Sequence, residues 1–213
     1  MTGTVPAARP RGLYLITPDE PDTGRLLARV EPVLATGPCW LQYRNKAADG
    51  RRRHEQARAL VQLCGQYGVP LLVNDDWRLA LEVGAAGAHL GAGDGALEEA
   101  RAGMGAQALL GASCYDDMDR ARRAVAAGAG HVAFGAFFAS STKPAAARAT
   151  PALLSDAGAL GVPVVAIGGI TPDNGRSLVE AGADLLAVIA GVFEAPDPVA
   201  AARAYQACFS PRP

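Results

Sequence analysis

The sequence predicts an α/β fold, a single-domain (β/α)8 TIM barrel, and three observations lead to it. Short apolar runs rich in Val, Leu and Ile alternate with helical stretches along the whole chain, as buried parallel strands do. Eight such runs occur, which is the number of strands in this barrel. Glycine-rich turns repeatedly separate a helix from the next strand. An open doubly wound sheet is the alternative.

The first half of the chain follows this alternation closely. Residues 12–17 form the first expected strand, and the loop after it lacks the glycines that wrap a pyrophosphate in a doubly wound sheet. A helix is expected over 23–35 and a second strand over 39–43. The helix expected over 51–66 gathers its Ala and Leu residues on one face. A Gly-Val-Pro turn then opens the third strand, 70–73.

The second half repeats the pattern. Strands are expected over 87–90, 108–113, 130–134, 163–167 and 184–189. A helix over 116–127 separates the fifth strand from the sixth. Glycines precede several of these strands, where they allow the left-handed turn that ends a helix.

Composition limits the classes of function. The 213 residues are 50% hydrophobic, which suits one compact domain with a sizeable core. The formal net charge of −1 provides no global field for nucleic acid or an anionic membrane, so we expect neither as a partner. No apolar run approaches the roughly 18 residues of a membrane span. We expect residues 1–11 to be a flexible tail and residues 12–208 to form the barrel, with a homo-oligomer left open.

The cysteines and the N-terminus favour a cytoplasmic protein. The four cysteines form no C-x-x-C pair and are irregularly spaced, as buried free thiols in a reducing compartment would be. The first residues contain no apolar stretch typical of a signal peptide.

Candidate site residues, most of them polar or charged, recur where the expected strands end, and in a barrel all these ends open on one face. They are Arg44 and Lys46 after the second strand, Asn74 and Asp75 after the third, Asp94 after the fourth, Ser113 at the end of the fifth, Lys143 after the sixth, Gly168 and Gly169 after the seventh, and Ala190 and Gly191 after the eighth. The sequence therefore predicts one active site at this face.

Two cations after the second strand can clamp a diphosphate. Gln42, Arg44 and Lys46 alternate along an extended segment, so their side chains share one side. Arginine binds phosphate oxygens as a bidentate fork and lysine as a point charge. The alternative is a strand end with ordinary solvated charges.

Two carboxylates at neighbouring strand ends, Asp75 and Asp94, can hold Mg²⁺. This ion prefers one or two carboxylates, with substrate phosphate oxygens and water completing its shell. Capping of the helices that follow is the alternative role for both residues, and it is the role we expect for Asp76.

Three later segments offer further candidates. The long loop over 135–150 contains Ser140, Ser141, Thr142 and Lys143, which would suit a phosphate-binding lid or, alternatively, a disordered connection. The glycine-containing loops after the last two strands can bind a phosphate through backbone N–H groups, or serve as tight packing turns. His89 lies in an apolar run, so we expect a core or barrel-lining histidine with a hydrogen bond, and a catalytic base is the alternative.

In combination these motifs resemble the thiamine-phosphate synthase family, also called thiamine-phosphate pyrophosphorylase, over about residues 12–205. The motifs, in the family's order, are Gln-x-Arg-x-Lys at 42–46, Asn-Asp at 74–75, His-Leu-Gly-x-x-Asp at 89–94, Thr-Lys at 142–143 and Ala-Ile-Gly-Gly-Ile at 166–170. The resemblance implies a transferase of thiamine biosynthesis. It would join a hydroxymethylpyrimidine diphosphate to a thiazole phosphate in its carboxylated form, giving thiamine phosphate and diphosphate.

The resemblance also implies a role for each matching position. The pyrimidine diphosphate would be held by Gln42, Tyr43, Arg44, Asn45, Lys46, Asn74, Ser113 and Lys143, of which Arg44, Lys46, Ser113 and Lys143 would be catalytic. Asp75 and Asp94 would hold Mg²⁺. The thiazole phosphate would be held by Ser140, Ser141, Thr142, Gly169, Ile189 and Ala190. Ser140 and Ala190 depart from the family, which usually has Thr and Ser there.

Three other functions compete with this one. A thiazole tautomerase of the same family would carry a histidine two positions past Ser113, where this chain has Tyr115. A non-catalytic sensor of phosphorylated ligands would not need two acids and a lid lysine. A phosphosugar isomerase with a barrel fold should show a general base at a strand end.

Overall fold

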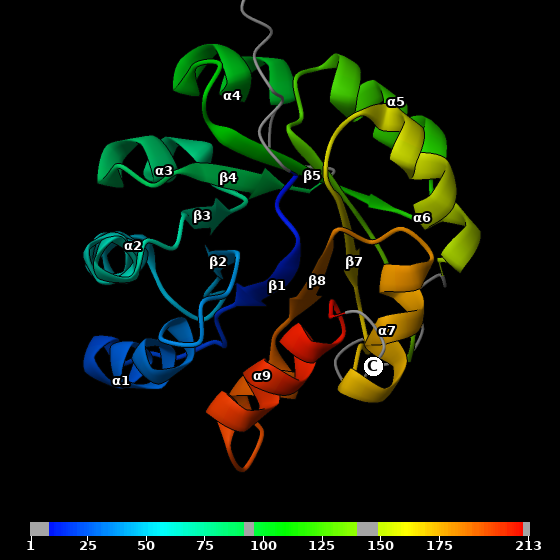
Figure 1. Cartoon of the computed structure of the whole chain (residues 1–213). Helices are drawn as coiled ribbons and strands as arrows, with labels where there is room; N and C mark the ends of the chain where they lie inside the picture. Colours follow the sequence, from blue (N-terminus) through cyan, green and yellow to red (C-terminus); the bar gives the residue numbers. More distant parts are fainter. Residues whose placement is uncertain (1–8, 92–95, 140–148, 211–213) are drawn as a thin grey trace, which may run out of the picture.

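Eight parallel strands close into a barrel, and helices surround it (Figure 1). In this computed structural model the described residues are 9–91, 96–139 and 149–210. The strands follow one another in chain order, and β1 pairs with both β2 and β8, so the sheet has no edge. The predicted (β/α)8 barrel is therefore confirmed and the open doubly wound sheet is excluded. The division into a tail over 1–11 and a barrel over 12–208 stays a prediction.

The strands lie close to their predicted positions. They are β1 (Gly12–Ile16), β2 (Trp40–Tyr43), β3 (Leu71–Asn74), β4 (Gly87–Leu90), β5 (Leu109–Tyr115), β6 (His131–Phe134), β7 (Val164–Ile167) and β8 (Leu185–Val188). The largest difference is in β5. The sequence predicts its end at Ser113, but the strand continues to Tyr115 after its register with β6 shifts. A bulge of this kind cannot be predicted from an apolar run, because it adds a residue without changing the pattern.

Each strand is followed by at least one helix. These are α1 (Thr23–Leu34), α2 (Gly50–Tyr67), α3 (Trp77–Val83), α4 (Leu97–Met104), α5 (Met118–Ala126), α6 (Pro151–Ala157) with a 3-10 turn (Gly158–Leu160), α7 (Pro172–Glu180), α8 (Ala190–Phe193) and α9 (Pro198–Ala207). The first and last long helices, α1 and α9, contact each other, so the ring of helices closes as the sheet does (Figure 1). No described helix is long and apolar enough to cross a membrane.

Aspartates begin five of the described helices. Each carboxylate accepts a hydrogen bond from the backbone N–H three residues later, and the five are Asp22, Asp49, Asp76, Asp117 and Asp197. A cap of this type stabilises a helix by about 1 kcal/mol. The predicted cap at Asp76 is confirmed, since its Oδ1 accepts from the N–H of Leu79 at 3.0 Å.

Alternating side chains of the strands fill two separate cores. Tyr14, Trp40 and Leu72 belong to the cluster inside the barrel, while Leu15 and Leu41 belong to the larger cluster that meets the helices. This alternation follows from the two-residue repeat of a strand. It also fixes which polar residues near the strand ends face the barrel axis.

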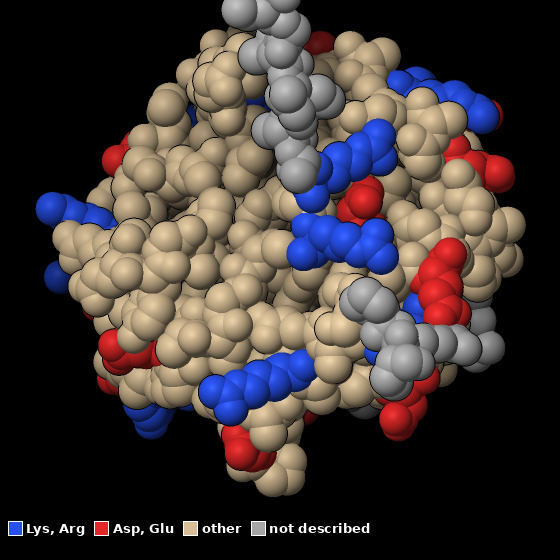
Figure 2. All heavy atoms as spheres, in the orientation of Figure 1, with Lys and Arg blue, Asp and Glu red and all other residues tan. Residues whose placement is uncertain are grey.

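Charge is spread thinly over the outside. On the face shown in Figure 2, basic and acidic side chains lie scattered among uncharged ones, and neither sign forms a broad patch. With a net charge of −1, binding of an anionic ligand must therefore depend on a local group of cations.

The inside of the barrel holds a buried histidine whose space depends on a glycine. The His131 ring is fully buried and lies 4.8 Å from the Trp40 ring, measured between centroids. A Cβ at Gly111, on the neighbouring strand, would overlap this ring. Glycine at 111 is thus required by packing.

We expect Gly111→Ala to lower the free energy of unfolding by about 1–3 kcal/mol, because an added methyl group must displace a packed ring. Urea unfolding would measure the change. Gly65→Ala is the matched control. It lies in α2 with open space around it, so the free energy of unfolding should rise by about 0.5–1 kcal/mol. Equal effects of the two substitutions would contradict the described interior packing.

Candidate active site

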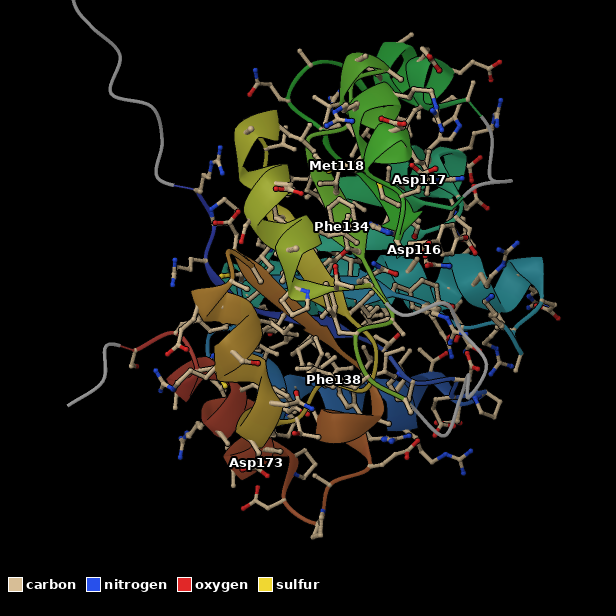
Figure 3. The ribbon with its side chains drawn as sticks, turned by 90° about the vertical axis from the view of Figure 1, so that its right-hand side faces the viewer. Asp116, Asp117, Met118, Phe134, Phe138 and Asp173 are labelled. Carbon is tan, nitrogen blue, oxygen red and sulfur yellow. The ribbon has the colours of Figure 1, made fainter. Side chains whose placement is uncertain are left out.

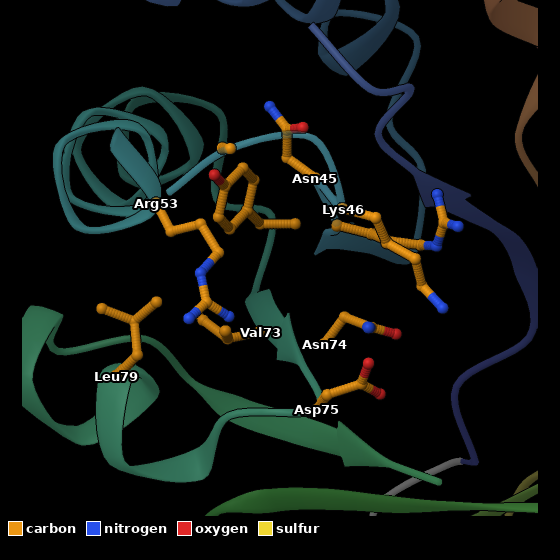
Figure 4. A pocket seen from close by; sticks show the side chains of 10 residues that line it. Asn45, Lys46, Arg53, Val73, Asn74, Asp75 and Leu79 are labelled. Carbon is orange, nitrogen blue, oxygen red and sulfur yellow. The ribbon is translucent and has the colours of Figure 1, made fainter. Parts of the chain in front are cut away.

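A cavity of about 310 Å³ lies where β2 and β3 end (Figure 4). It is lined by Tyr43, Arg44, Asn45, Lys46, Ala48, Arg53, Val73, Asn74, Asp75 and Leu79. The lining thus contains three cations and one carboxylate. A polar cavity with this excess of positive charge suits an anionic ligand.

The segment that carries Arg44 and Lys46 is fixed by the loop after β1. Thr17 Oγ1 accepts from the backbone N–H of Arg44 and donates to its carbonyl, both at 2.8 Å. Asp19 Oδ1 accepts from the backbone N–H of Lys46 at 2.8 Å. The backbone below the two cations is therefore held at three points, which orients their side chains before any ligand binds.

Asp19 also faces the guanidinium of Arg44, at 3.4 Å from its Nη1. The Arg44 side chain is 23% exposed and that of Asp19 is 43% exposed. Ion pairs this exposed contribute little to stability, about 0–1 kcal/mol. Arg44 can therefore exchange this carboxylate for a phosphate at small cost.

Tyr43 and Asn45, on either side of Arg44, are both hydrogen-bonded to Gln56 of α2. The Tyr43 hydroxyl donates to Gln56 Oε1 at 2.8 Å, and Asn45 Nδ2 donates to the same oxygen at 3.0 Å. Asn45 Nδ2 and Gln56 Nε2 also donate to the carbonyl of Glu20. These contacts tie β2 to α2 and to the loop after β1. A direct role of Tyr43 and Asn45 in holding the diphosphate stays a prediction.

Gln42 faces the barrel axis, as alternation with Tyr43 requires. Its side chain is buried, and its Nε2 donates to the hydroxyl of Tyr14 at 2.7 Å. Burial raises the pKa of Tyr14, so this hydroxyl stays protonated. Gln42 is thus held rigidly beneath the mouth of the barrel.

Asn74 ends β3, and Asp75 turns the chain at the rim of the cavity. Asp75 has a φ of 65°, a left-handed conformation that is uncommon outside glycine. Its backbone N–H donates to the carbonyl of His89 on β4 at 2.9 Å. Figure 4 shows the amide of Asn74 and the carboxylate of Asp75 directed toward the end of Lys46. Left-handed residues held in this way cluster at functional sites.

The donors present fit Mg²⁺. Asp75 supplies one carboxylate, and one or two are enough when substrate phosphates and water complete the shell. The described residues contain no group of three or more His, Cys, Asp or Glu side chains that could hold a metal alone. The second predicted ligand, Asp94, lies outside the described residues.

Ser113 on β5 is hydrogen-bonded to His89, which in turn is bonded to His131 inside the barrel. His89 Nε2 lies 3.0 Å from Ser113 Oγ, and His89 Nδ1 lies 3.1 Å from His131 Nε2. His131 Nδ1 is buried and, among the described groups, has no hydrogen-bond partner. Burial, and then the neighbouring His89, hold the pKa of His131 well below its usual value. The predicted barrel-lining position of His89 agrees with this arrangement.

The direction of these hydrogen bonds bears on Ser113. A buried N–H without an acceptor is rarer than a buried acceptor without a donor. The unpartnered His131 Nδ1 should therefore carry no proton, which places the proton of His131 on Nε2. His131 Nε2 then donates to His89 Nδ1, so His89 carries its proton on Nε2 as well. Ser113 Oγ then accepts from His89 and keeps its own proton for a further acceptor.

The loops after β7 and β8 are joined by a tyrosine of α9. The Tyr205 hydroxyl donates to the carbonyl of Ile170 at 2.8 Å, and a Cβ at Gly191 would overlap this hydroxyl. A Cβ at Gly169 would collide with the carbonyls of Phe138 and Ala139, in the segment after β6 (Figure 3). Tight packing thus requires both glycines. Phosphate binding by Gly169, Ile189 and Ala190 stays a prediction.

Other predicted site residues lie outside the described residues. They are Asp94 and the lid residues Ser140, Ser141, Thr142 and Lys143. The structure also brings three residues to the cavity or its border that the sequence did not predict there, Thr17, Asp19 and Arg53. Thr17 and Asp19 could have been noticed, because Thr17 ends the first expected strand, 12–17, and Asp19 lies two residues beyond it.

Comparisons with known proteins agree on one family. A family model described as thiamine monophosphate synthase matches residues 13–192. A thiamine-phosphate synthase from Azoarcus sp. (strain BH72) is 59% identical over 203 residues, which cover 95% of this chain and 98% of the relative. The one from Xanthomonas campestris pv. campestris (strain 8004) is 58% identical over 200 residues, covering 94% of this chain and 96% of the relative.

Solved structures agree as well. Thiamine phosphate pyrophosphorylase from Pyrococcus furiosus superposes with a TM-score of 0.81 and 30% identity, covering 94% of this chain and 96% of that one. A 3-hexulose-6-phosphate synthase superposes with a TM-score of 0.69 at 16% identity, over 93% of this chain and all of that one, and shares the fold alone.

The buried histidine predicts a pH dependence of stability. The pKa of His131 is lowered in the folded chain, whereas an unfolded histidine titrates near pH 6.5. The unfolded chain then binds a proton that the folded chain does not. The free energy of unfolding should therefore fall as pH drops below about 6.5, by up to about 1.4 kcal/mol per pH unit.

Urea unfolding at pH 7.5, 6.5 and 5.5 would measure this slope. The His131→Gln variant lacks the titrating group, so its slope should be smaller by the contribution of one proton. Identical slopes in the two proteins would contradict a neutral buried His131.

Proposed function

The chain belongs to the thiamine monophosphate synthase family and is a transferase, and we propose that it joins a hydroxymethylpyrimidine diphosphate to a thiazole phosphate. The thiazole would enter in its carboxylated form, and the products would be thiamine phosphate, diphosphate and the CO2 lost from the thiazole carboxyl group. The observation that carries this proposal is the cavity where Arg44, Lys46 and Asn74 surround one carboxylate, Asp75.

These cations would stabilise the departure of the diphosphate. As the bond between the pyrimidine methylene and the diphosphate oxygen breaks, negative charge accumulates on the leaving group. Arg44 would accept this charge as a bidentate fork and Lys46 as a point charge. Because Thr17 and Asp19 already hold their backbone, little reorganisation is needed when the charge forms.

Asp75 and Asp94 would hold Mg²⁺ against the diphosphate. The bound ion would supply neutralising charge to the phosphate oxygens. The left-handed turn at Asp75 keeps its carboxylate at the rim beside Asn74, whose amide can donate to the same phosphates. Lys143 would add a further cation from the loop after β6.

The two rings must meet for the new bond to form. The aminopyrimidine is electron-rich and can bear the developing positive charge at its methylene, where the thiazole nitrogen would attack. Gln42 and Ser113, both fixed by buried partners, would orient the pyrimidine diphosphate. The thiazole phosphate would be held by Ser140, Ser141, Thr142, Gly169, Ile189 and Ala190. Proximity of the two substrates then lowers the barrier without an enzyme nucleophile.

No specific observation favours the tautomerase. That activity would use a histidine at position 115, where this chain has a tyrosine with 47% of its surface exposed. The Tyr115 ring lies under the guanidinium of Arg120, 5.3 Å from the ring centroid. Tyrosine has no imidazole nitrogen to act as the neutral proton acceptor in that reaction.

The direct test is incubation with both substrates, with and without Mg²⁺. We expect diphosphate release and thiamine phosphate formation in equal amounts, only when the thiazole phosphate and Mg²⁺ are both present. Diphosphate release from the pyrimidine substrate alone would indicate a hydrolase. Isomerisation of the thiazole without diphosphate release would indicate the tautomerase, and binding without turnover would indicate a sensor.

A matched pair of variants tests the role of Asp75 in the same assay. Asp75→Asn removes the charge, while asparagine tolerates the left-handed backbone, so the fold should persist. We expect turnover to fall at least 10²-fold, as for Lys143→Ala, in line with the loss of other electrostatic groups. The exposed Asp156→Asn on α6 is the control and should leave turnover unchanged. Near-normal turnover in Asp75→Asn and Lys143→Ala would contradict these roles.

A further inference from the structure

Arg53 is a cation of the cavity to which no role has been given above. It lies in the first turn of α2, behind the segment that carries Arg44 and Lys46. Figure 4 shows its side chain extending beside Val73 and Leu79, across the cavity from Lys46. The cavity therefore has cations at both ends, two from the strand rim and one from the ring of helices.

The guanidinium of Arg53 is held loosely. Its ion pair is with Asp76 Oδ2, at 3.9 Å from Nη1, and the two side chains are 39% and 34% exposed. A separation of 3.9 Å is too long for a hydrogen bond. The other oxygen of Asp76 is engaged in capping α3. The ion pair thus restrains Arg53 near the cavity without saturating its donors.

Two other arginines, one on α2 and one on α1, use donors within the protein. Arg52, its neighbour, donates to the carbonyl of Pro21, and Arg29 donates to the carbonyl of Phe193. Within the described ranges, Arg53 makes its one ion pair and no such hydrogen bond. A planar fork of uncommitted donors facing a polar cavity is suited to a phosphate.

The direction of the substrate follows from the two ends of the cavity. Gln42 and Ser113, which face the barrel axis, would orient the pyrimidine diphosphate, so its ring should lie toward that axis. The diphosphate would then extend outward past Arg44, Lys46 and Asn74. Its last phosphate would reach the helix side, where Arg53 lies.

We propose that Arg53 binds the phosphate farthest from the reacting methylene and so makes the site selective for a diphosphate over a monophosphate. This inference rests on the proposed function, because it assumes that the diphosphate occupies this cavity. The surface ion pair with Asp76 contributes little to stability, so the fold does not depend on Arg53.

The test is calorimetric binding of inorganic diphosphate and of inorganic phosphate, each in the presence of Mg²⁺. In Arg53→Gln, diphosphate should bind about tenfold to hundredfold more weakly, because one or two charge-assisted hydrogen bonds are lost. The affinity for inorganic phosphate should change by less than about threefold, since Arg44 and Lys46 remain. Arg53→Lys keeps the charge but not the fork, and should fall between wild type and Arg53→Gln.

Arg51→Gln is the matched control. Arg51 lies in the same turn of α2, is exposed and does not line the cavity, so the variant should bind both anions as the wild type does. Circular dichroism and thermal unfolding of each variant would verify the fold.

The outcomes separate this inference from the proposed function. Wild-type affinity for diphosphate in Arg53→Gln would overturn the role of Arg53 alone. Equal weakening of phosphate and diphosphate would overturn its assignment to the farther phosphate. A wild-type protein that makes thiamine phosphate, but binds diphosphate no more tightly than phosphate, would overturn the selectivity and leave the proposed function standing. Failure of wild type to bind diphosphate at all would overturn both.

Discussion

The pairing of β1 with β8 closes the sheet, and every part of the site depends on this closure. Arg44, Asn74, Ser113 and Gly169 are far apart in the sequence. They come to one rim because the strands that precede or carry them are all parallel and their barrel has no edge. Closure also buries the interior histidines, which in turn hold Ser113. An open sheet of the same strands would spread these groups along an edge.

Two cations of the site are held by weak ion pairs. Arg44 faces Asp19 and Arg53 faces Asp76, in both cases through partly exposed ion pairs longer than 3.3 Å. Such pairs are easily exchanged for a phosphate. The strong hydrogen bonds lie one step away, between backbone groups and Thr17 or Asp19. The backbone of the rim is thus rigid, while its cationic side chains are free to bind an anion. This arrangement stabilises a developing negative charge with little reorganisation.

The sequence could predict the barrel, its strands and the helix cap at Asp76, because these depend on local patterns of apolar, glycine and aspartate residues. It could also predict that Gln42 and Arg44 share a side, since alternation is a local rule. The contacts of Tyr43 and Asn45 with Gln56 could not be predicted, because they depend on how α2 crosses β2. Arg53 was missed for the same reason. Three consecutive arginines begin α2, and only packing decides which of them reaches the cavity.

The central claim is that the leaving diphosphate is bound by the cations of the rim. The most direct measurement is a crystal structure with Mg²⁺, diphosphate and thiamine phosphate bound. The account predicts diphosphate oxygens within hydrogen-bond distance of Arg44, Lys46 and Asn74, with the metal on Asp75. Diphosphate bound at another place, with Arg44 still paired to Asp19 and Asp75 away from any metal, would contradict it.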